Sequence, residues 1–101
     1  MSVEFVCVVG TEKDWRGAFL DAIRSNPSYQ LLSSCDDDQL LLRIAKNPPR
    51  SNWPEDVTLL FRTGQICVQF HSADRSDRTT LIALLETTLA HFGSAARFTE
   101  E

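Results

Sequence analysis

The chain has 101 residues, a formal net charge of −4 and 43% apolar residues. This length is typical of a single domain, and the apolar content argues against a disordered chain. Its ten basic residues are scattered along the sequence, so nucleic acid is not expected as a partner, because such proteins concentrate positive charge on one face.

The cysteines indicate a cellular compartment. Cys7, Cys35 and Cys67 are odd in number and widely spaced, which does not fit a disulfide framework. Free thiols are typical of a reducing environment, and no apolar run is long enough to span a membrane. We therefore expect a cytoplasmic protein without membrane contact.

The first third of the chain predicts a strand followed by a helix. Residues 3–9 are rich in β-branched and aromatic side chains, which favours a strand. Thr11 is expected to cap the helix, and Asn26-Pro27 ends it, because the residue before proline avoids helical geometry. Apolar residues recur at helical spacing at Trp15, Ala18, Phe19, Ala22 and Ile23.

The middle of the chain is less regular. Residues 29–35 predict a strand, and residues 39–46 fit either a strand or a two-turn helix, with the strand favoured. Between them, Asp36, Asp37 and Asp38 form an acidic turn. Three prolines then make residues 47–56 a long loop, since proline disfavours both helix and central strand.

A hairpin and a second helix complete the prediction. Residues 57–63 and 65–72 read as two strands joined at Gly64, and the second strand alternates apolar with polar side chains. The helix is expected to be capped by Ser76 or Asp77 and to end at Gly93. Its apolar stripe consists of Leu81, Leu84, Leu85, Leu89 and Phe92.

The predicted fold class is α+β, with the order β-α-β-β-β-β-α. Four consecutive strands indicate a mainly antiparallel sheet of four to five strands. Each helix has one apolar stripe, so both are expected on the same face, with the other face open to solvent. Residues 1–93 would form this single domain, and residues 94–101 a C-terminal tail.

Few residues point to chemistry. Cys67 and His71 share one side of a strand, but four residues along a strand is about 13 Å, too far for direct proton transfer. The three aspartates of the acidic turn lack the spacing of a calcium loop. No phosphate loop or metal-ligand spacing occurs, so we expect no cofactor, no metal and no catalysis.

Binding is the better interpretation. Trp53 is either a lid on the core or an interface anchor, because tryptophan is enriched at binding hot spots. The candidate contact residues are the acidic turn and the acidic part of the proline-rich loop: Asp36, Asp37, Asp38, Trp53, Glu55 and Asp56. An acidic surface speeds association with a basic partner.

In size, charge and loop composition the chain resembles the small cytoplasmic immunity proteins that bacteria make against their own secreted toxins. This resemblance involves no diagnostic motif and assigns no residue a role. It implies a non-catalytic, stoichiometric inhibitor that blocks the active site of a basic toxin domain. A small-molecule-sensing regulatory domain is the alternative, and a small cysteine- or metal-dependent enzyme the second. The open sheet face also suggests a homodimer.

Overall fold

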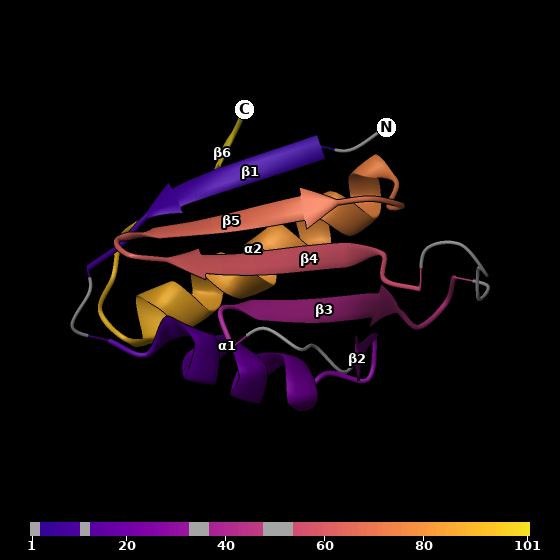
Figure 1. Cartoon of the computed structure of the whole chain (residues 1–101), viewed down its shortest axis with the longest axis horizontal. Helices are drawn as coiled ribbons and strands as arrows, with labels where there is room; N and C mark the ends of the chain where they lie inside the picture. Colours follow the sequence, from indigo (N-terminus) through magenta and orange to yellow (C-terminus); the bar gives the residue numbers. More distant parts are fainter. Residues whose placement is uncertain (1–2, 11–12, 33–36, 48–53) are drawn as a thin grey trace.

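The computed structural model describes residues 3–10, 13–32, 37–47 and 54–101. It contains six strands and two helices (Figure 1). In chain order these are β1 (Val3–Val8), α1 (Trp15–Arg24), β2 (Tyr29–Leu32), β3 (Gln39–Ile44), β4 (Val57–Arg62), β5 (Gln65–Phe70), α2 (Arg75–His91) and β6 (Thr99–Glu100).

All strands belong to one antiparallel sheet with the spatial order β2-β3-β4-β5-β1-β6. Strands β2 to β5 form a meander, and β1 adds to β5 on its far side. The α+β class is therefore confirmed, with more strands than predicted because the C-terminal segment contributes β6. Helix α1 connects β1 with β2, and β2 is the edge strand at the far end of the sheet from β1.

Strand β3 resolves the ambiguity over residues 39–46. It pairs with β2 on one side and β4 on the other, so its backbone is satisfied by the sheet. Its side chains alternate: Leu40, Leu42 and Ile44 are at most 4% exposed, whereas the residues between them are half-buried. A period of two is typical of a strand with one buried face.

Both helices cover the same face of the sheet. Residues that pair directly in an antiparallel ladder point to the same side. One side carries a single core cluster, into which α1 inserts Phe19 and Ile23. Helix α2 inserts Leu81, Leu85 and Leu89, which are fully buried. Figure 1 is viewed from the opposite side, with α2 seen behind the strands. That opposite side is the open face.

The helix caps differ from the prediction. Asp14 caps α1, and its Oδ1 accepts a hydrogen bond of 3.0 Å from the Gly17 N–H. Thr11, the expected cap, lies outside the described residues. Asp74 caps α2, and its Oδ1 accepts a 2.8 Å bond from the Asp77 N–H. In both helices the cap is an aspartate two or three residues before or after the residue that was expected. Aspartate, serine and threonine all cap helices well, so the sequence alone does not decide between them.

The C-terminal segment returns to the sheet after α2. Gly93 has a φ of +84°, which reverses the chain at the end of the helix. The Phe98 N–H then donates a 2.9 Å hydrogen bond to the Glu86 carboxylate, and Phe98 packs against the core. Beyond it, β6 pairs with β1. Residues 94–101, expected to be a tail, thus contain β6, one of the two edge strands of the sheet.

Candidate binding surface

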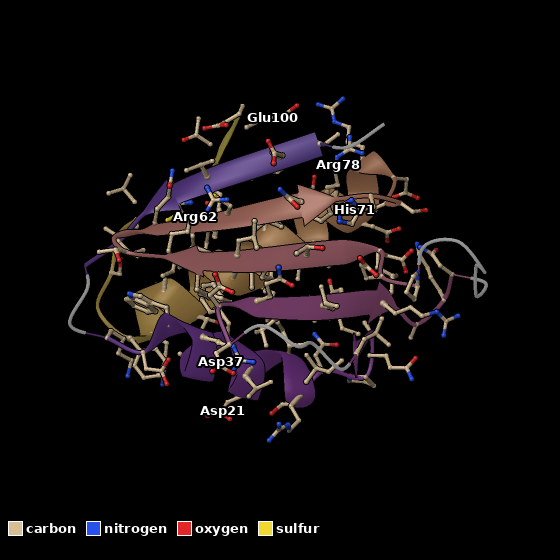
Figure 2. The ribbon with its side chains drawn as sticks, in the orientation of Figure 1. Asp21, Asp37, Arg62, His71, Arg78 and Glu100 are labelled. Atoms are coloured by element: carbon tan, nitrogen blue, oxygen red, sulfur yellow. The ribbon has the colours of Figure 1, made fainter. Side chains whose placement is uncertain are left out.

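The open face is built from rows of side chains that run across the strands. The central row is Gln39, Leu60, Cys67, Val6 and Thr99, from β3, β4, β5, β1 and β6. The next row is Leu32, Leu41, Thr58, Gln69 and Glu4. Figure 2 shows this face, with Arg62 and His71 at its two ends.

The centre of the open face is apolar. Leu60, Cys67 and Val6 lie side by side in the central row. Leu60 and Val6 are half-buried, and Cys67 is 7% exposed. Burial raises the pKa of the Cys67 thiol, so the thiol is neutral at physiological pH. No helix of the described chain covers this apolar centre.

Opposite charges lie on either side of Cys67. Glu4 lies on the neighbouring strand β1, opposite Gln69, two residues beyond Cys67. Arg62 lies on the other neighbouring strand, β4, opposite Gln65, two residues before Cys67. The electrostatic effects on the thiol agree with this placement, because Arg62 lowers its pKa while Glu4 and Glu101 raise it, all more weakly than burial does. Glu4 accepts a 2.7 Å hydrogen bond from Gln69, and Arg62 is exposed.

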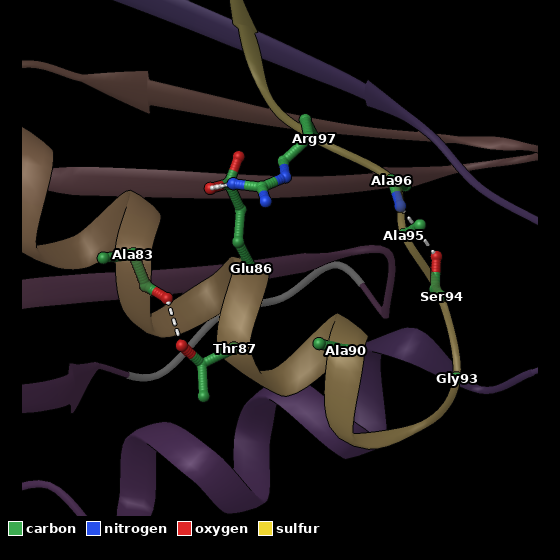
Figure 3. Close-up of a pocket in the computed structure, with 9 residues that line it drawn as sticks. All are labelled: Ala83, Glu86, Thr87, Ala90, Gly93, Ser94, Ala95, Ala96 and Arg97. Carbon is green, nitrogen blue, oxygen red and sulfur yellow. Dashed lines mark hydrogen bonds and ion pairs between the residues drawn. The ribbon is translucent and has the colours of Figure 1, made fainter.

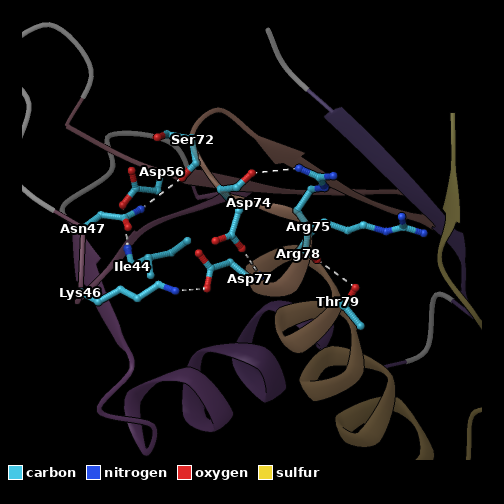
Figure 4. Close-up of polar contacts among 11 residues, drawn as sticks. Ile44, Lys46, Asn47, Asp56, Ser72, Asp74, Arg75, Asp77, Arg78 and Thr79 are labelled. Atoms are coloured by element: carbon cyan, nitrogen blue, oxygen red, sulfur yellow. Dashed lines mark hydrogen bonds and ion pairs between the residues drawn. The ribbon is translucent and has the colours of Figure 1, made fainter.

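A polar network holds the end of the open face where β3 stops. The Asp56 carboxylate accepts a 2.8 Å hydrogen bond from the Ile44 N–H (Figure 4). Its backbone N–H donates to Leu42, and its carbonyl accepts from His71, both at 2.8 Å. The His71 ring is in turn hydrogen bonded through Nε2 to the Thr58 hydroxyl at 2.9 Å.

The acidic turn lies at the other end of β3. The carboxylates of Asp37 and Asp38 are exposed, and no hydrogen bond or ion pair to either occurs within the described chain. Arg16 of α1 reaches the same end of β3, but its Nε donates to the Gln39 carbonyl at 3.2 Å. Asp36 lies outside the described residues. Figure 2 shows Asp37 and Asp21 along the margin formed by α1.

The candidate residues predicted from the sequence are divided between two ends of the sheet. The Asp38 carbonyl accepts a hydrogen bond from Phe61, near the end of β4, whereas Asp56 directly precedes β4. At the strand rise, those two positions on β4 are about 16 Å apart. Glu55 is half-buried beside Asp56, and Trp53 lies outside the described residues. Asp56 itself is 3% exposed, so its carboxylate faces the protein rather than a partner.

Cys67 is not placed as a catalytic thiol. Cys67 and His71 remain four residues apart along β5 and its extension, and the His71 Nε2 is bonded to Thr58. The neutral Cys67 thiol lacks the lowered pKa of a nucleophile. Cys35 lies outside the described residues. Among the residues that the structure describes, no three His, Cys, Asp or Glu side chains gather as a metal site.

A groove on the helix side offers little chemistry. It has a volume of about 580 Å³ and runs between α2 and the C-terminal segment (Figure 3). Ala83, Ala90, Ala95 and Ala96 form much of its wall. The one carboxylate there, Glu86, is already bonded to the Phe98 N–H and to Arg97. Thr87 and Ser94 also line the groove, and their hydroxyls are hydrogen bonded to Ala83 and Ala96, so these polar groups are already engaged within the described chain.

Sequence reasoning missed the two most informative features of this surface. Nothing in the sequence indicated that Asp56 is buried, because an acidic residue after a proline-rich loop is expected to be exposed to solvent. The placement of Glu4 and Arg62 about Cys67 depends on β1 pairing beside β5. The alternation of each strand indicates which residues share a face but not which strands are neighbours.

Comparison with models of known protein families gave no match, and comparisons with curated proteins and with solved structures gave none either. Within the described residues, neither helix combines the length and the apolar character needed to cross a lipid bilayer.

Proposed function

We propose that the chain is a non-catalytic protein-binding module that inhibits a basic protein, in the manner of a bacterial immunity protein that blocks a toxin's active site. The observation that carries the proposal is that the Asp37 and Asp38 carboxylates, before the start of β3, are exposed and have no hydrogen bond or ion pair within the described chain. Unpaired acids on a net negative protein attract a basic partner.

The setting of this turn favours binding. Strand β3 is bonded to β2 and β4, and the Asp38 carbonyl accepts a 2.8 Å hydrogen bond from Phe61. Arg16 fixes the Gln39 carbonyl instead of pairing with either acid. Carboxylates in a turn that is anchored to an ordered strand lose less conformational entropy on binding than those on a loose segment.

The proposal is tested by capture of a partner from extracts of the cells that make this protein, at low salt, with identification by mass spectrometry. The test variant replaces Asp37 and Asp38 with Asn. The matched control replaces Glu100 and Glu101 with Gln, which removes the same charge at the opposite edge of the sheet.

We expect the wild-type chain and the control to retain a basic protein that the Asp37→Asn, Asp38→Asn variant loses. The loss should shrink as salt rises, because salt at about 0.15 M screens charges over about 8 Å. Equal retention by both double variants, or capture of acidic proteins only, would overturn the proposal.

A further inference from the structure

One pair of charges on the open face has the arrangement that a self-complementary surface needs. In a two-fold dimer the same patch meets itself, so each charge needs its opposite at the symmetry-related position. Glu4 and Arg62 are related in this way about Cys67. From the strand spacing and rise, each lies about 8 Å from Cys67 and the two are about 17 Å apart.

We propose that the open face is a contact between two copies of this chain, packed sheet to sheet about a two-fold axis that passes over Cys67. The axis lies between the sheets and perpendicular to the line from Glu4 to Arg62. Glu4 of one copy then faces Arg62 of the other, and the reverse pair forms by symmetry. Sheets that pack face to face are about 10 Å apart, which long Glu and Arg side chains can bridge.

The apolar centre supplies the rest of the contact. Leu60, Cys67 and Val6 lie around the axis, and Leu41 extends the apolar patch toward β3. No helix of the described chain covers these side chains, and Leu60, Val6 and Leu41 remain half-buried. Packing two such centres together removes apolar surface from water, which is the main driving force of association.

The size of the face sets the expected strength. The six strands contain 30 residues in all. At a strand spacing of about 4.8 Å and a rise of about 3.3 Å per residue, they give a footprint of about 480 Å² per copy. Two copies would bury about 1,000 Å², at the lower end of specific interfaces and typical of transient ones. We therefore expect a dissociation constant in the micromolar range rather than a permanent dimer.

Sedimentation equilibrium over about 1 μM to 1 mM protein tests the proposal, since it covers the expected affinity range. The average mass should rise with concentration from the monomer mass of 11.4 kDa toward twice that value. Glu4→Arg places two cations opposite each other, and Arg62→Glu places two acids opposite each other. Each single variant should weaken the dimer at least tenfold, and the double variant should restore it.

The control is Arg75→Glu, which changes the same charge on α2, away from the open face, and should leave the dimer unchanged. Circular dichroism would establish that each variant is folded. A wild-type chain that stays monomeric at 1 mM would overturn the proposal. So would a folded double variant that stays as weak as the single ones, or an Arg75→Glu control that dissociates equally.

This inference does not depend on the proposed inhibitor role. Self-association is measured on the purified chain alone, whereas capture of a basic partner depends on Asp37 and Asp38. Dissociation of the dimer by Glu4→Arg with partner capture intact would separate the two surfaces. Leu60→Arg gives a second disruption of the dimer through the apolar centre, independent of the Glu4 hydrogen bond to Gln69.

Discussion

The Asp56 carboxylate accepts a hydrogen bond of 2.8 Å from the backbone N–H of Ile44, although Asp56 is only 3% exposed. The same residue bonds through its backbone to Leu42 and His71. One residue thereby joins the end of β3, the start of β4 and the end of β5, where the proline-rich loop enters the sheet.

Asp56→Ala should therefore destabilise the protein strongly. The Ile44 N–H would lose its charged acceptor at a buried site, which costs about 1.5–3 kcal/mol. Urea unfolding measures this loss. Glu55→Ala is the matched control, since Glu55 is half-buried and should change the unfolding free energy by about 0.5 kcal/mol or less. Equal unfolding midpoints for the two variants would contradict the role assigned to Asp56.

Cys7 should make stability fall at alkaline pH. Burial, with a smaller effect of Glu86, raises the pKa of its thiol from 9.0 to about 11. Below about pH 9 the thiol is protonated in both the folded and the unfolded state, so its contribution is constant. Between pH 9 and 11 the unfolded chain releases the proton first, which favours unfolding by about 2–3 kcal/mol at the upper limit.

The measurement is the unfolding free energy from pH 8 to 11 for the wild type and for Cys7→Ala. The variant keeps every other titrating group, including Tyr29, whose pKa is also raised, first by burial and then by Asp77. Its decline across this window should be shallower than that of the wild type. Parallel curves would show that Cys7 is not the group responsible.

Asp74 should stabilise α2 as its cap. Asp74→Ala leaves the Asp77 N–H without its side-chain acceptor and should cost about 0.5–2 kcal/mol in thermal or urea unfolding. Asp74→Ser should retain most of the stability, because serine also caps helices. Ser76→Ala is the control for a change in the same turn, and a loss equal to that of Asp74→Ala would contradict this assignment.

The charge of Asp74 adds a pH dependence. The hydrogen bond from the Asp77 N–H, followed by the lesser effect of Lys46, lowers the pKa of Asp74. A lowered pKa gives stability that is present above the unfolded-state value and is lost as pH falls through the folded-state value. Asp74→Ser should remove this part of the acid sensitivity, so its stability should change less than that of the wild type below pH 4.

Gly93 should resist substitution for a backbone reason alone. Its φ is +84°, and a Cβ added there would meet no atom within 4 Å. Gly93→Ala should therefore cost about 1–2 kcal/mol, from the left-handed conformation rather than from a clash. Gly93→Asn should cost less, because asparagine tolerates this conformation. Thermal unfolding distinguishes the two, and equal losses would point to a steric cause.

Local pattern was enough to predict β1, β2, β4 and β5, both helices and the hairpin turn at Gly64, whose φ is +73°. The sequence of β3 was ambiguous because six residues rich in apolar side chains fit both the period of a strand and that of a helix. Only the pairing of β3 with β2 and β4 establishes that it is a strand. Strand β6 has two residues and depends on contact with β1, so it carries no sequence signal of its own. Several residues able to cap a helix precede each helix, so the sequence did not decide at which residue the helix begins.

The candidate surface was less predictable than the fold. The acidic turn could be read from the sequence because three consecutive aspartates disfavour a strand. The burial of Asp56 and the opposition of Glu4 and Arg62 about Cys67 arise from long-range strand pairing. Residues 4 and 62 come to lie on the two strands beside β5 only after the chain has folded, so the spacing of residues along the sequence does not predict their placement.

The central claim, that this chain inhibits a basic partner, is tested most directly by titration of the captured partner's activity with purified chain. The account predicts a linear fall in activity that reaches zero at one equivalent, with Asp37→Asn, Asp38→Asn requiring a large excess at low salt. A captured partner that keeps its full activity when the chain is in tenfold excess would contradict the claim.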